Sequence, residues 1–122
     1  SKDNVSFTPT YELVNVSMFE QFTHSLAMAI GDEFEPKDIH AYQMPDFAET
    51  CHLDKKLVSR MLISLSNNVL QAIDERHFLT ELLEQQVLST EEHLYIDVLL
   101  ENIKTRTTYL KNQAKYIVTI EI

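Results

Sequence analysis

Helix-breaking residues are confined to the first part of this 122-residue chain. The four glycine and proline residues are Pro9, Gly31, Pro36 and Pro45. Because these residue types interrupt helices most strongly, residues 46–122, which contain neither, are predicted to be mainly helical, with polar caps at the helix ends. Residues 1–45 are predicted to form short extended segments, turns and loops.

Caps and apolar spacing predict three helices in the second part. Pro45 suits the first turn of a helix that runs to about Cys51, because a missing N–H is no loss there. Asp54 is placed to cap a longer helix, and Ser89 with Glu92 forms the signature of a capping box before the last one. The longer helix has an apolar stripe of Leu57, Val58, Met61, Leu62, Leu65, Val69 and Ile73. The pattern continues, either on the same axis or after a bend, at Phe78, Leu79, Leu82, Leu83 and Val87. The last helix carries Ile96, Leu99, Leu100, Ile103, Leu110 and Ala114 on one face.

Short strands are predicted near both ends of the chain. Residues 5–7 alternate apolar and polar before Pro9, which predicts a short edge strand, and residues 12–23 are predicted to form a brief helix. The apolar run 26–30, closed by Gly31 and Asp32, is predicted to be a buried strand. The β-branched residues of 116–122 predict a last strand that could pair with residues 5–7. The predicted fold class is therefore mainly α, with residues 1–122 forming one domain or part of one.

The charge balance disfavours nucleic acid as a binding partner. The formal charge is −9, from 10 Lys and Arg residues against 19 Asp and Glu residues, whereas binding along a nucleic-acid backbone requires clustered positive charge. Four bases nevertheless occur without an acid between residues 104 and 115: Lys104, Arg106, Lys111 and Lys115. Lys104, Lys111 and Lys115 fall on roughly one helix face. They could contact phosphate or an acidic partner, or only compensate the helix dipole.

The cysteine content and the hydropathy of the chain indicate the cellular compartment of the protein. Cys51 is the one cysteine, so no internal disulfide can form, which indicates a reducing environment. No apolar run approaches the roughly 20 residues of a membrane span, and no signal peptide is visible, so a cytoplasmic location without membrane partners is expected. The first residue is serine rather than methionine, and we therefore expect a piece of a longer protein.

No metal or nucleophile site is predicted from the residue spacing. The histidines are His24, His40, His52, His77 and His93. They form no i, i+4 pair, and a structural zinc site needs converging ligands. Cys51 is predicted to be a small core residue rather than a nucleophile. The acidic loop 32–38 lacks the ligand pattern of an EF-hand and is predicted to be a solvated loop.

Several segments occur in an order and spacing that resembles the HipA-like serine/threonine kinases. Residues 7–14 read Phe-Thr-Pro-Thr-Tyr-Glu-Leu-Val, similar to the family's Leu-Thr-Pro-x-Tyr-Asp-Leu. Residues 26–31 read Leu-Ala-Met-Ala-Ile-Gly, similar to its Leu-Ala-Met/Leu-x-Ile-Gly. Residues 38–39 and 47–50, with the helix to Ile73, continue in the family's order. The resemblance covers most of the chain and implies the C-terminal, helical part of a HipA-like kinase lobe.

The chain is not expected to transfer phosphate alone. Phosphoryl transfer needs a loop over the phosphates, a catalytic Asp and metal-binding side chains. One glycine in 122 residues excludes a glycine-rich loop, and the resemblance places the catalytic Asp and Asn upstream of Ser1. It also places Glu12 where the family has a metal-binding Asp, a departure because Mg²⁺ demands near-ideal distances. ATP and Mg²⁺ are thus implied only for the intact parent.

The resemblance also implies partners. They are the remainder of the kinase chain and a DNA-binding antitoxin of HipB type, in a toxin–antitoxin system of persistence-type growth control. Direct nucleic-acid binding by this chain is not expected. The alternative is a small helical interaction module, an adaptor or inhibitor, which could also form a homodimer through exposed apolar surface.

Overall fold

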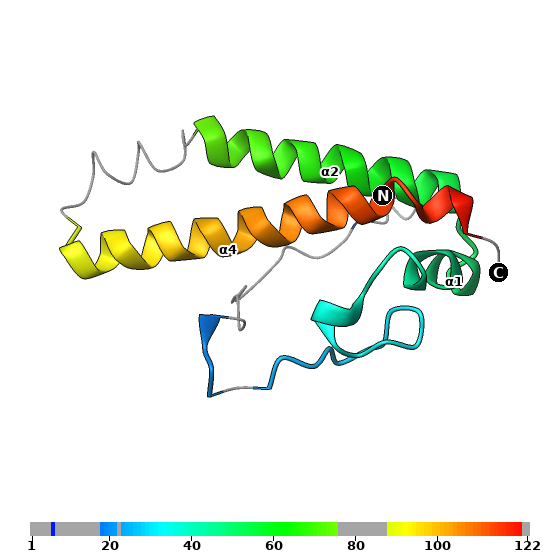
Figure 1. The fold of residues 1–122 in the computed structure, drawn as a ribbon, viewed down its shortest axis with the longest axis horizontal. Helices are drawn as coiled ribbons and strands as arrows, with labels where there is room; N and C mark the ends of the chain where they lie inside the picture. Colours follow the sequence, from blue (N-terminus) through cyan, green and yellow to red (C-terminus); the bar gives the residue numbers. More distant parts are fainter. Residues whose placement is uncertain (1–5, 7–17, 22, 76–87, 121–122) are drawn as a thin grey trace.

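The computed structural model describes residue 6 and residues 18–21, 23–75 and 88–120 (Figure 1). The described elements are the 3₁₀ helix η2 (Pro36–Asp38), the helices α1 (Gln43–Thr50), α2 (Lys55–Glu75) and α4 (Thr90–Ala114), and the 3₁₀ helix η3 (Ile117–Thr119). The fold is mainly α, as the absence of glycine and proline from residues 46–122 predicts.

The two long helices, α2 and α4, lie side by side and antiparallel (Figure 1). At one end Ile73 of α2 packs with Leu100 of α4 in a small apolar cluster. At the other end the Ser59 hydroxyl donates a hydrogen bond of 2.7 Å to the carbonyl oxygen of Ala114. Ser66, seven residues from both Ser59 and Ile73, is also buried. Small side chains on this face of α2 leave room for α4 to approach closely.

The main core lies where α1 and η3 meet the antiparallel pair. Its buried residues are Ile39, Met44, Ala48, Val58, Ala114 and Ile117, with Leu26, Ile30, Leu62 and Ile63 packed against it. Ile117 and Ala114 are fully buried. The apolar residues that precede α1 and follow α4 thus close one end of the helical pair.

The predicted helix starts are confirmed, because caps are local features. Pro45 is the third residue of α1 and lies in its first turn, where its missing N–H is no loss. The backbone N–H of Lys56 donates to the Asp54 carboxylate at 2.8 Å, at the start of α2. Ser89 and Glu92 form both hydrogen bonds of a capping box. Cys51, predicted to be a core residue, is instead exposed at the C-terminal end of α1.

The prediction of a strand over residues 116–122 is wrong for the residues described there. Ile117–Thr119 form the 3₁₀ helix η3. The backbone N–H groups of Thr119 and Ile120 donate to the carbonyl oxygens of Tyr116 and Ile117, at 3.1 and 3.3 Å. These short-range bonds replace a sheet partner, and the β-branched Ile117 serves to fill the core. Residues 121–122 lie outside the described residues.

The buried strand predicted over residues 26–30 is also wrong. Pairing among the described residues is limited to an isolated bridge between Ile30 and Glu33, and the Met28 side chain is exposed. The predicted turn is present: Gly31 and Asp32 have φ of 55° and 64°, the positive φ pair of a two-residue hairpin turn. Leu26 and Ile30 still contact the core, so the segment is an irregular loop anchored at both ends.

Three predictions fall mostly or wholly on residues whose structure is not described. They are the edge strand over residues 5–7, the brief helix over residues 12–23, and the continuation of the apolar stripe through Phe78, Leu79, Leu82, Leu83 and Val87. They remain predictions.

Candidate functional site

Three side chains on one face of α4 hold the loop that precedes α1. Arg106, Tyr109 and Gln113 are spaced at i, i+3 and i+7, which places them on one face of the helix. The Arg106 guanidinium donates a hydrogen bond to the carbonyl oxygen of Pro36, and its carbon lies 5.1 Å from the centre of the Tyr109 ring. This distance is within the range of a cation–π interaction. We call Arg106, Tyr109 and Gln113 the loop clasp.

The other two members of the clasp bind the end of the same loop. The Tyr109 hydroxyl is hydrogen-bonded to Nδ1 of His40, and the two rings meet edge to face. The Gln113 side-chain oxygen accepts a bond of 2.9 Å from the backbone N–H of Ala41. Arg106 was predicted only as part of a basic spot. Its loop contact could not be found from the sequence, because 70 residues separate it from Pro36.

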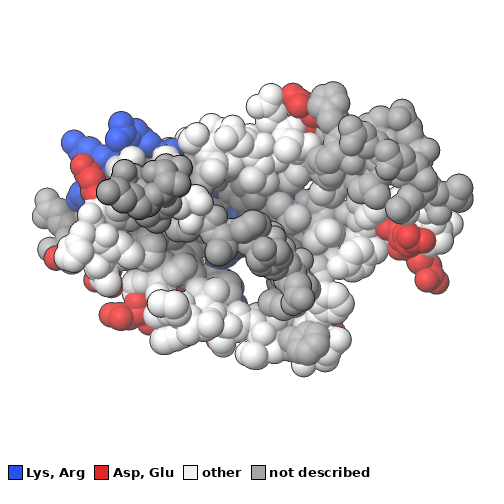
Figure 2. All heavy atoms as spheres, turned by 180° about the vertical axis from the view of Figure 1, so that it is seen from behind, with Lys and Arg blue, Asp and Glu red and all other residues white. Residues whose placement is uncertain are grey.

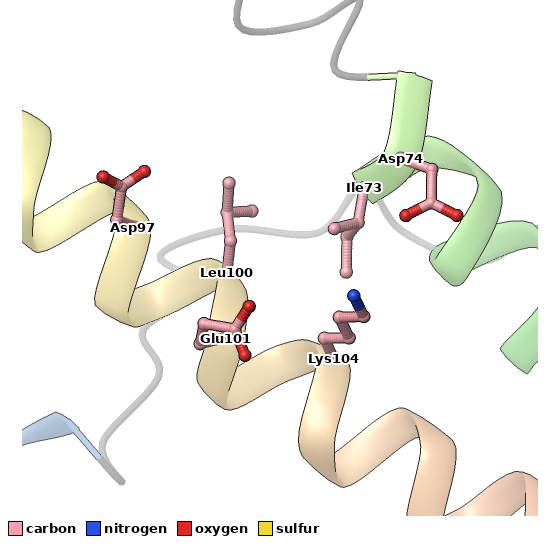
Figure 3. Close-up of a pocket in the computed structure, with 6 residues that line it drawn as sticks. All are labelled: Ile73, Asp74, Asp97, Leu100, Glu101 and Lys104. Carbon is pink, nitrogen blue, oxygen red and sulfur yellow. The ribbon is translucent and has the colours of Figure 1, made fainter.

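A hollow of about 420 Å³ lies between the end of α2 and the middle of α4 (Figure 3). Ile73 and Leu100 form its apolar floor, and its charged rim consists of Asp74, Asp97, Glu101 and Lys104. The three carboxylates outnumber the one ammonium group, so the rim is net negative. Such a rim favours binding of a cationic or neutral ligand over binding of a phosphate.

The three lysines predicted as a phosphate or partner contact do not gather at one point. Lys104 lies on the acidic rim of the hollow, and Lys115 is the C-cap residue of α4. The helix rises 1.5 Å per residue, so Lys104 and Lys115 are separated by about 16 Å along its axis. Lys111 lies between them and is half-buried. One phosphate group could therefore contact at most one end of this row.

A second basic group was missed in the sequence, although its signal is plain there. Lys55, Lys56 and Arg60 occupy the first two turns of α2, and that first turn contains no acid. Figure 2 shows Lys and Arg side chains gathered at one end of the molecule. The Lys55 ammonium group donates a bond of 2.9 Å to the carbonyl oxygen of Ile120. One of the three cations thus helps to hold the end of the chain in place.

Glu12, the predicted metal-binding position, lies outside the described residues. Within the part of the chain that the structure describes, no three His, Cys, Asp or Glu side chains converge as metal ligands would. The acidic loop is held internally instead: the Ser25 hydroxyl donates to the Glu35 carboxylate at 2.6 Å, and the Glu33 carboxylate accepts from the backbone N–H of Glu35 at 3.1 Å.

Helix α2 presents an apolar row to solvent. Leu57, Met61, Leu65 and Val69 recur every four residues and are 39%, 52%, 56% and 37% exposed. The i, i+4 spacing aligns them as one ridge along the helix. We call these residues the α2 row. They belong to the apolar stripe predicted along this helix, and this part of the stripe faces outward.

The described helices include none that is both long and apolar enough to cross a membrane. Comparison with protein-family models finds no match. A stretch of 68 residues, 56% of this chain, is 44% identical to the serine/threonine-protein kinase toxin HipA of Shewanella oneidensis. The matched stretch spans 16% of the length of that relative. The resemblance to HipA-like kinases is thereby confirmed over more than half of the chain.

Proposed function

We propose that this chain is the C-terminal, helical section of the kinase lobe of a HipA-like serine/threonine kinase. The observation that carries the proposal is the 44% identity to the HipA toxin kinase over 68 residues. The parent protein would transfer phosphate from ATP to a protein target. It would act in the cytoplasm as the toxin of a toxin–antitoxin pair in persistence-type growth control.

A scaffold role within that lobe is supported by the contacts of the described residues. The loop clasp fixes residues 36–41 against α4 through bonds at both ends of the loop. Gly31 lies in the turn before this loop, and its lack of a side chain lets the turn approach Gln43 at the start of α1 closely. The single glycine of the chain rules out a glycine-rich phosphate loop within these 122 residues. The groups that hold the nucleotide would therefore come mainly from elsewhere in the parent.

Glu12 is the position in this chain that we assign to the metal. A carboxylate is a ligand that Mg²⁺ prefers. In a kinase such a side chain helps to neutralise the charge that develops on the transferred phosphate. One carboxylate does not make a magnesium site, so Glu12 would complete a site formed with other groups of the parent.

The alternative function is a helical interaction module, an adaptor or inhibitor. The α2 row favours it, since exposed apolar ridges are typical of surfaces that bind another protein. The two functions differ in one respect that can be measured directly. A kinase transfers phosphate, and an interaction module does not.

The test is ATP- and Mg²⁺-dependent autophosphorylation of the intact protein that carries this segment. Glu12→Ala is expected to lower the rate by about two orders of magnitude, because it removes a metal ligand. Glu12→Asp is the matched control: it keeps the carboxylate and restores the family's residue, so activity should persist. Native-like circular dichroism of both variants would show that any loss is not unfolding.

Two results would contradict the proposal in different ways. Full activity of Glu12→Ala would remove Glu12 from the metal site while leaving the kinase assignment in place. No phosphorylation by the wild-type protein, at any Mg²⁺ concentration, would favour the interaction module and direct the search to protein partners.

A further inference from the structure

The α2 row points to a docking surface, and we infer that it receives an amphipathic helix from the part of the same polypeptide beyond these 122 residues. The inference rests on the proposed function in one respect, because it takes the chain to be one section of a larger protein. The chemistry of the occupant follows from the row: an apolar ridge with i, i+4 spacing, flanked from Met61 onward by uncharged side chains.

The composition of α2 around the row indicates that this part of the helix is covered. Residues 61–73 contain no charged side chain over thirteen positions. A helix that faces water on its outer side normally carries charges there. Helix α4 does so, with the exposed residues Glu91, Glu92, Asp97, Glu101 and Lys104. The two helices are of similar length, so the difference indicates that α2 is covered over its middle part.

The surface area of the row favours a segment of the same polypeptide over a second copy of the chain. From the exposed fractions of its four side chains, the row presents roughly 330 Å² of surface. In two copies paired row to row, these side chains would therefore contribute roughly 700 Å² of buried surface, below the about 1,200 Å² of a stable specific interface. An occupant on the same polypeptide needs less area, because its effective concentration is high.

Ion pairs would favour pairing of two copies, but their contribution to the binding free energy is small. In an antiparallel pair of α2 helices, Lys55 and Lys56 of one copy would approach Asp74 and Glu75 of the other. Exposed ion pairs of this kind contribute about 0–1 kcal/mol each. They cannot replace the missing apolar area.

The HipA toxin kinase is long enough to show how much chain such a parent could add. The 68 matched residues are 16% of the HipA toxin kinase, which therefore has about 425 residues. A parent of that length would supply about 300 residues beyond this chain. Helices of a kinase lobe pack around a shared core, so an uncovered ridge on one section is expected to meet another.

The test measures the accessibility of single cysteines in the intact parent protein. In a background with Cys51→Ser and any other cysteine of the parent replaced, Leu65→Cys and Met61→Cys report on the row. Arg60→Cys is the matched control on the same helix, at a charged and exposed position. We expect a thiol reagent to label positions 61 and 65 about tenfold or more slowly than position 60. This protection should not depend on protein concentration.

Two outcomes would overturn the inference. Equal labelling rates at positions 60, 61 and 65 would show that the row faces solvent in the parent. Protection that appears only as the protein concentration rises would assign the row to a second copy. Autophosphorylation of the same preparations separates this inference from the proposed function: protected cysteines in a protein without kinase activity would leave the docking surface standing and remove the kinase assignment.

Discussion

The Ser59 hydroxyl of α2 donates a hydrogen bond of 2.7 Å to the carbonyl oxygen of Ala114, the last residue of α4. Both residues are buried. The last carbonyl groups of a helix have no partner within the helix. Ser59 therefore supplies from a neighbouring helix the partner that the end of α4 lacks, and it fixes how the two helices are aligned.

Replacing Ser59 tests this contact. Ser59→Ala leaves the buried carbonyl of Ala114 without that donor, and we expect the free energy of unfolding to fall by about 1–3 kcal/mol. Ser64→Ala, an exposed serine on the same helix, should change it by about 0.5 kcal/mol or less. Urea unfolding followed by circular dichroism measures both. Equal effects of the two substitutions would show that the bond does not stabilise the fold.

The loop clasp gives a second prediction. Tyr109→Phe removes the hydroxyl bonded to His40 and keeps the ring beneath Arg106. We expect a loss of about 1 kcal/mol, the typical contribution of one partly exposed hydrogen bond. Tyr95→Phe, at an exposed tyrosine of the same helix, is the control and should be nearly neutral. A stability of Tyr109→Phe equal to wild type in urea unfolding would remove the His40 bond from the clasp.

Gly31 gives the third prediction. Its φ is +55°, and a Cβ added there would lie 2.4 Å from the backbone oxygen of Gln43. Backbone atoms at the start of α1 cannot move aside as a side chain can, so we expect Gly31→Ala to cost about 2 kcal/mol or more. Asp32→Gly, at the neighbouring positive φ, should be close to neutral because glycine adopts this conformation easily. A shift in thermal midpoint that is the same for both substitutions would contradict the contact.

The capping box gives a prediction about pH. Hydrogen bonds from the backbone N–H and the side chain of Ser89 lower the pKa of Glu92 below its usual 4.5. Because the pKa is lower in the folded chain than in the unfolded chain, the carboxylate stabilises the fold above the unfolded pKa. That contribution is lost as the pH falls through the folded pKa.

Glu92→Gln checks the sign of this effect. The variant should be less stable than wild type at neutral pH, and the difference should shrink in acid, where the wild-type carboxylate is protonated. Glu91→Gln is the matched control in the same turn but outside the capping box. Thermal unfolding at neutral and acidic pH measures the difference. A stability difference between wild type and Glu92→Gln that is the same at neutral and acidic pH would show that the carboxylate charge is not involved.

Features that depend on near neighbours in the chain could be predicted from the sequence. The helix starts at Asp54 and Ser89 and the turn at Gly31 and Asp32 were predictable, because caps and turns are formed by residues a few positions apart. The mainly α class followed from the long stretch without glycine or proline. The HipA-like resemblance came from the order of short segments and was confirmed over 68 residues.

Contacts between distant residues are visible only in the packed structure. Arg106 contacts Pro36, and Ser59 contacts Ala114, across 70 and 55 positions of the chain. No local pattern encodes such pairs, and for the same reason Ile117 was predicted in a strand although it fills the core. The apolar spacing of α2 predicted one stripe, but only the packed structure divides it into Val58 and Ile73 within the two clusters and the α2 row outside them. That division depends on where α1, η3 and α4 lie around the helix, because burial is a property of the neighbours rather than of the residue itself.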